Sequence, residues 1–90
     1  MDTKAKVEEV RTRVRVLVRD LAPNPRPEVT PSTRLIEDLG YHSLVLIELA
    51  TMMESTFAIE PITESEAMSI LTVGELEGLI VRRVTGQEVV

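Results

Sequence analysis

The sequence lacks cysteine and tryptophan, and aromatic residues make up only 2% of its 90 positions. The absence of cysteine excludes disulfides, thiolate catalysis and cysteine-ligated zinc. His42 is the single histidine, so a histidine-based metal cluster is excluded as well, and the carboxylates show no spacing typical of metal ligands. We therefore expect no metal site and a core built from aliphatic side chains.

Long apolar runs are also missing. Charged residues interrupt the first ten positions, where a signal peptide would need an apolar stretch, and no later segment approaches the roughly 20 residues of a membrane span. We expect a soluble cytoplasmic protein without a membrane segment. Residues 1–90 should form a single domain, because so short a chain buries only about 60% of its unfolded surface.

Positive charge is absent from half of the chain. Between Leu35 and Gly78 there is no lysine or arginine, while nine carboxylates fall in this stretch. Such a segment repels nucleic acid and anionic membranes and is steered toward basic protein surfaces. The alternative is an acidic face that only keeps the protein in solution.

Helical periodicity is present along most of the chain. The first segment repeats apolar residues at steps of three and four, and four prolines between Pro23 and Pro31 then predict a long, packed-down connector. The pattern predicts an all-α, four-helix bundle of three long helices and one short helix, with a long first loop. The expected bounds are about 3–21, 43–57, 64–71 and 73–84 for the helices and 22–42 for the loop. The inner stripe of the first helix should contain Val7, Val10, Val14, Leu17 and Leu21.

The later helix starts have their own signals. Thr63 with Glu66, and Thr72 with Glu75, have the spacing at which a hydroxyl and a carboxylate cap each other's backbone N–H groups. Gly40 can take the positive φ of a sharp turn before the second long helix.

The second long helix has more apolar residues than one buried stripe can use. Its inner stripe is expected to consist of Leu46, Leu49, Ala50, Met53 and Phe57. Leu44, Val45 and Ile47 are surplus to that stripe, so some of them should be exposed.

No set of residues predicts catalysis. His42 and Ser43 are sequence neighbours at a helix start, where side chains project in different directions, and the four glycines are too scattered for a phosphate-binding loop. Ser43 itself follows a turn and opens a helix, where an attached phosphate would lie beside unpaired N–H groups. A serine in this place can equally be a helix cap.

The segment Leu35–Leu44, with the sequence LIEDLGYHSL, resembles the phosphopantetheine attachment motif of the acyl and peptidyl carrier proteins. The leading amphipathic helix, the proline-bearing loop, Phe57 and the Thr72–Val73 pair follow in the order of that family, so the resemblance covers nearly the whole chain. It implies an acyl-carrier-like fold, no catalytic activity, and Ser43 as the site to which a phosphopantetheinyl transferase attaches 4'-phosphopantetheine from coenzyme A. The cofactor would supply the thiol that carries acyl or aminoacyl groups.

The resemblance also implies a docking surface for basic regions of the transferase and of loading and condensing enzymes. The alternative for Leu44 and Ile47 is a half-buried position against the long loop. We expect the carrier to be a monomer that binds neither nucleic acid nor membrane. The residues assigned to partner docking are Asp38, His42, Leu44, Ile47, Glu48, Thr51 and Glu54.

One position departs from the acyl carrier pattern. Acyl carriers usually have aspartate before the serine, whereas His42 here matches many peptidyl carriers and Asp38–Tyr41 matches the acyl type. This mixed motif favours polyketide, nonribosomal peptide or hybrid biosynthesis, with fatty-acid synthesis as the alternative. His42 can also be a plain capping or surface residue. A different class of function is a helical interaction module that never receives the cofactor.

Overall fold

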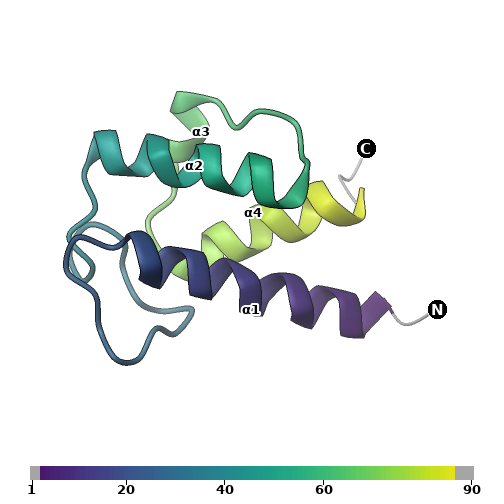
Figure 1. The fold of residues 1–90 in the computed structure, drawn as a ribbon, viewed down its shortest axis with the longest axis horizontal. Coiled ribbons are helices and arrows are strands. Elements are labelled where there is room, and N and C mark those ends of the chain that lie inside the picture. Colours follow the sequence, from purple (N-terminus) through teal and green to yellow (C-terminus); the bar gives the residue numbers. More distant parts are fainter. Residues whose placement is uncertain (1–2, 87–90) are drawn as a thin grey trace.

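The computed structural model describes residues 3–86, which form four α-helices joined by loops. In chain order these are α1 (Thr3–Leu21), α2 (Ser43–Phe57), α3 (Glu64–Ser69) and α4 (Val73–Thr85) (Figure 1). Over these residues no strand forms, and a single antiparallel bridge pairs Arg34 with Thr72. The predicted all-α bundle of three long helices and one short helix is confirmed.

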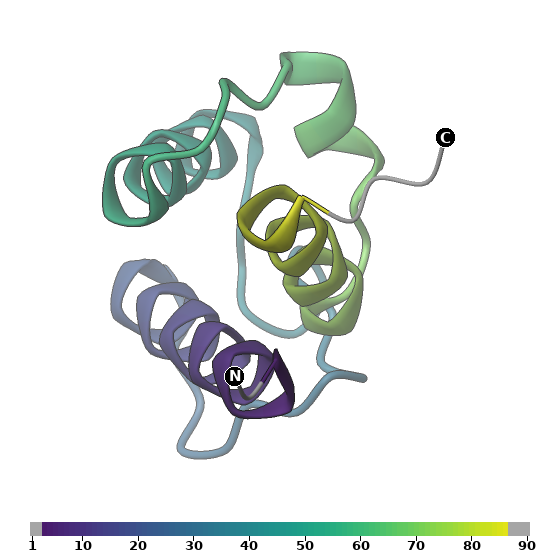
Figure 2. The ribbon, with the colours of Figure 1, turned by 90° about the vertical axis from the view of Figure 1, so that its right-hand side faces the viewer.

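The three long helices surround a common core. Figure 2 looks along them and shows α1, α2 and α4 around a shared interior, with α3 beside α2 and α4. On α1 the most deeply buried side chains are Val14 and Val18, while Leu17 and Leu21 only pack against the edge of the core. The omission of Val18 from the predicted stripe was therefore wrong, because Val10, Val14 and Val18 recur at steps of four and form the buried face of α1.

Both predicted capping boxes are confirmed. The Thr63 hydroxyl accepts the Glu66 N–H and the Thr72 hydroxyl accepts the Glu75 N–H, and each glutamate returns a bond to its threonine N–H. The helix α3 ends at Ser69 rather than near Leu71, because Ile70 adopts an extended backbone and turns its side chain into the core.

The long loop 22–42 is packed down, as expected. The Asn24 N–H donates to the Leu39 carbonyl at 2.9 Å, and Leu35 and Leu39 are buried. A helical turn follows Pro31, with the Asp38 N–H bonded to the Arg34 carbonyl at 3.1 Å. These bonds fix the loop that leads into α2.

The same loop is bonded to the start of α4. The Leu35 N–H donates to the Leu71 carbonyl at 3.0 Å, and the Gly74 N–H donates to the Pro31 carbonyl at 2.9 Å. A Cβ at position 74 would lie 3.0 Å from the Pro31 oxygen, so glycine permits this close approach. These bonds join the loop to the start of α4.

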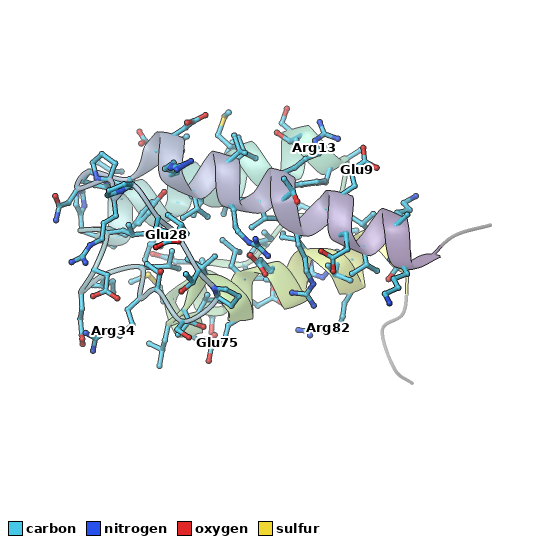
Figure 3. The ribbon with its side chains drawn as sticks, turned by 90° about the horizontal axis from the view of Figure 1, so that it is seen from below. Glu9, Arg13, Glu28, Arg34, Glu75 and Arg82 are labelled. Atoms are coloured by element: carbon cyan, nitrogen blue, oxygen red, sulfur yellow. The ribbon has the colours of Figure 1, made fainter. Side chains whose placement is uncertain are left out.

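An ion cluster joins α1 to α4, which lie side by side when seen from below (Figure 3). Glu77 of α4 is fully buried, and it is the only charged residue among the described ones that is. Its carboxylate accepts hydrogen bonds from Arg11 at 3.0 Å and Arg15 at 2.5 Å, whose side chains are about one-third exposed. Glu77 is one of the nine carboxylates counted between Leu35 and Gly78, and its burial was not predicted.

Residues 3–86 include no helix with the length and apolar character that a bilayer crossing requires.

Candidate functional site

Ser43 is the first residue of α2, and three neighbours fix its position. Gly40 turns the chain with φ of +76°. Tyr41 is buried, and its hydroxyl donates to the Val18 carbonyl of α1 at 2.6 Å. His42 is extended at the N-cap, and Leu46 then anchors the first turn of α2 in the core. The Ser43 side chain is left exposed on a firmly held helix end.

The amino end of α2 has no cap. His42 makes no side-chain capping bond, and the first turn contains no acidic residue. The first bond into the helix runs from the Leu46 N–H to the His42 carbonyl at 2.8 Å. No described group accepts the N–H groups of Ser43, Leu44 and Val45, so three donors and the positive end of the helix dipole point outward.

Ser43 is not the cap that one interpretation of the sequence made it, because His42 holds that position. Within the described part of the chain the Ser43 hydroxyl has no hydrogen-bond partner, and His42 does not bond to it. A serine nucleophile needs a base within hydrogen-bond reach, and no such pair is formed. The hydroxyl is accessible to an external reagent and is not activated by the protein itself.

One face of α2 carries five of the residues predicted for docking. Leu44 is 63% exposed and Ile47 is 39% exposed, and Glu48 and Thr51 are also exposed. Leu44 therefore does not lie half-buried against the loop. An apolar face with acids beside it runs from the exposed serine along the helix.

Two predicted docking carboxylates have bonds within the fold. Asp38 accepts the Arg34 N–H at 2.8 Å, and this bond, with those from the Arg34 guanidinium, lowers the pKa of Asp38 below its usual value. Glu54 accepts the Ile62 N–H at 2.7 Å, which ties the end of α2 to the loop before α3. These acids shape the loops on either side of α2, while Glu48 has no such partner within residues 3–86.

Comparison with known proteins identifies the family. The family model described as "Phosphopantetheine attachment site" matches residues 12–80, which is most of the chain. The chain belongs to this family of phosphopantetheine-bearing carrier proteins.

Two relatives align with most of this carrier. The acyl carrier protein of Borreliella burgdorferi (strain ZS7) is 32% identical over 76 residues, which cover 84% of this chain and 94% of the relative. That of Wolinella succinogenes is 43% identical over 61 residues, which cover 68% of this chain and 78% of the relative.

Membership explains the chemistry that the chain lacks. Carrier proteins of this family are not enzymes, and they bind 4'-phosphopantetheine covalently. A phosphopantetheinyl transferase modifies them, and acyl-handling enzymes use them. The amino end of α2 fits the group, because an anionic phosphodiester is favoured beside outward-pointing N–H groups and the positive end of a helix dipole.

Exposed apolar residues of the carrier also lie outside the predicted docking set. Ile36 is 51% exposed, Met68 is 45% exposed and Leu71 is 62% exposed. The bond between Leu35 and Leu71 brings the segments of Ile36 and Leu71 together. The signal that could have found them was the one used on α2, an apolar residue beyond the needs of its buried stripe.

The core beneath α2 holds one very small cavity. Its volume is about 10 Å³, which is the space of a single water-sized sphere. No carbon chain fits there unless the helices move. The lining is entirely aliphatic and consists of Leu35, Leu46, Leu49, Ala50, Ile62, Ala67, Ile70 and Leu76.

Proposed function

We propose that Ser43 is the attachment site, and that residues 1–90 act as one monomeric domain that presents thioester-bound intermediates to partner enzymes. The observation that carries this assignment is the exposed, unbonded Ser43 hydroxyl at the uncapped end of α2, inside the segment that resembles the attachment motif. The family match spans that segment and supports the assignment.

The bond-making step of the attachment uses no group of the carrier beyond the hydroxyl. The Ser43 oxygen forms a bond to the phosphorus of the phosphopantetheine half of coenzyme A. The bond from that phosphorus to the nucleotide half breaks, the nucleotide leaves with the bonding electrons, and a base of the transferase takes the hydroxyl proton. Among the described residues no base is hydrogen-bonded to the Ser43 hydroxyl, which accords with a transferase that supplies the base.

The docking surface in this proposal centres on α2. Leu44 and Ile47 would enter apolar pockets of a partner, Glu48 would meet its basic groups, and Thr51 would lie against it. Asp38 and Glu54 would add long-range charge while keeping their bonds to Arg34 and Ile62. Exposed Ile36, Met68 and Leu71 would extend the apolar area beyond α2.

The attachment motif bears on the kind of biosynthesis that the carrier serves. His42 before the serine, together with the acyl-type Asp38–Tyr41 segment, supports service in polyketide, nonribosomal peptide or hybrid biosynthesis. The alternative is fatty-acid synthesis, which is favoured by two relatives that are both called acyl carrier protein. Intact mass of the protein from its producing cells would show the loaded group and separate the two.

The attachment is tested with coenzyme A and a broad-specificity transferase. Intact mass spectrometry should show one added phosphopantetheine on the wild type and none on Ser43→Ala. Ser55→Ala is the matched control, because Ser55 is an exposed serine of the same helix, and this variant should be modified normally. A wild type that stays unmodified would support the interaction module instead.

A further inference from the structure

His42 is the ionisable residue next to Ser43 in the sequence, and its side chain is exposed. Between Asp38 and Glu48 the only ionisable side chains are Tyr41 and His42. The Tyr41 hydroxyl is buried and bonded to the Val18 carbonyl at 2.6 Å. His42 is exposed, and no group of residues 3–86 bonds to its imidazole.

His42 is the N-cap residue of α2, and Thr63 and Thr72 are the N-cap residues of α3 and α4. Thr63 and Thr72 each accept a first-turn N–H, whereas the imidazole of His42 accepts none. The backbone of His42 has the extended N-cap conformation, with φ of −135° and ψ of 176°. The cap position is therefore formed, but its acceptor is missing.

We infer that the imidazole of His42 binds the phosphodiester carried by Ser43, so that a phosphate oxygen supplies the missing cap while His42 donates an N–H to the same phosphate. This inference rests on the attachment proposed above. A phosphate on the first residue of α2 is bonded to the Oγ atom of Ser43, close to the three unaccepted N–H groups and one residue from His42. The base of the flexible arm would then be held and not swing freely.

The charges carried by neighbouring segments leave this role to His42. In the preceding loop Asp38 is paired with Arg34 and Arg26, and Glu37 is paired with Arg34. At the start of α4 the Glu75 carboxylate is bonded to the Leu71 and Thr72 N–H groups. On α2 itself the first acid is Glu48, which follows the first turn.

A prediction about acidity follows. A phosphodiester keeps one negative charge throughout the range in which histidine titrates, so it should raise the pKa of His42 when it is attached. Below that pKa the charged imidazolium holds the phosphate, and above it the hold weakens. The arm should therefore be most restrained on the acidic side of the titration.

The experiment uses NMR on the unmodified and modified proteins. His42 is the only histidine, so its ring resonance needs no assignment, and the attached group supplies the only phosphorus. The histidine midpoint should be higher in the modified protein than in the unmodified one, and the ³¹P resonance should titrate with the same midpoint. His42→Asn, once intact mass shows that it has been modified to completion, should show a flat ³¹P titration. Glu60→Gln, the control for an exposed acid outside the docking surface, should keep the wild-type titration.

The outcomes separate this inference from the proposed function. A modified protein with an unchanged histidine midpoint and a flat ³¹P resonance would overturn the role of His42 and leave the attachment intact. A ³¹P titration that persists in His42→Asn would overturn it as well. A wild type that gains no phosphopantetheine mass would overturn the attachment itself.

Discussion

The amino ends of α3 and α4 differ sharply from that of α2. Thr63 and Thr72 close the first two with reciprocal bonds to Glu66 and Glu75, whereas α2 begins with His42 and Ser43 and no capping bond. A capping side chain typically contributes about 1 kcal/mol, so an uncapped helix forgoes stability of that order. Side-chain caps are present on α3 and α4, which have no role in the proposed attachment beyond the stability of the fold. The amino end of α2 is open, and a negatively charged group can add the missing acceptors there.

The largest effect on stability is expected away from the open end of α2, at the α1–α4 interface. Glu77→Gln removes the charge that two arginines bind and should lower the free energy of unfolding by about 2 to 4 kcal/mol. Denaturant unfolding measures the loss. Phosphopantetheine transfer to the folded fraction should keep its wild-type rate, since Ser43 lies on another helix. A variant as stable as the wild type would show that the ion cluster contributes nothing net.

Tyr41 lies between the packed core and the open end of α2, because it is buried while its neighbour His42 is exposed. Tyr41→Phe leaves the Val18 carbonyl without its 2.6 Å hydrogen bond and should cost about 1 to 2 kcal/mol in thermal or denaturant unfolding.

Tyr41 should also make the stability of the fold fall at alkaline pH. Burial, with a smaller contribution from Asp20, raises the pKa of Tyr41 in the folded protein. The unfolded chain then loses the phenolic proton first, so stability is complete below a pH of about 10 and falls as the pH rises above it. Absorbance of this single tyrosine reports the titration. A wild type and a Tyr41→Phe variant with identical alkaline unfolding profiles would contradict this prediction.

A cap deletion sharpens the comparison between helix ends. Thr72→Ala removes the hydroxyl that accepts the Glu75 N–H and should lower stability by about 1 kcal/mol. Ser43→Ala, at the open end of α2, should change stability by less than about 0.5 kcal/mol. Equal losses in chemical denaturation would mean that the Ser43 hydroxyl caps α2 in solution.

The smallest effect on stability is expected on the outer face of α2. Leu44→Ala changes a side chain that is 63% exposed, so the melting temperature should move little. The kcat/KM of the transferase should fall several-fold, because the lost contact would lie in the partner's pocket. Leu46→Ala is the matched control, with a buried side chain in the same turn whose loss should cost about 2 to 5 kcal/mol. A large stability loss in Leu44→Ala would return that residue to the core.

The sequence predicted the features that depend on local pattern. Helical spacing placed the helices, and the threonine and glutamate pairs located the starts of α3 and α4. The end of α3 was misplaced, because Leu71 is held by a bond from Leu35, far away in the chain. Local pattern carries no information about such a partner.

Glu77 shows the same limit at the level of side chains. It lies four residues after Val73 and three before Ile80, so the period of α4 places it on the buried face. A lone carboxylate is costly to bury, so periodicity alone does not predict that Glu77 lies in the core. Only the packing of α1 against α4 shows that Arg11 and Arg15 are there to bind it.

The central claim is that the open end of α2 accepts the cofactor on Ser43, and peptide mapping of the modified protein tests it most directly. Cleavage after glutamate releases residues 38–48, in which Ser43 is the only serine. The account predicts that tandem mass spectrometry finds phosphopantetheine on this peptide and on Ser43. Finding it on a peptide that contains Ser32, Ser55, Ser65 or Ser69, with residues 38–48 bare, would contradict the account.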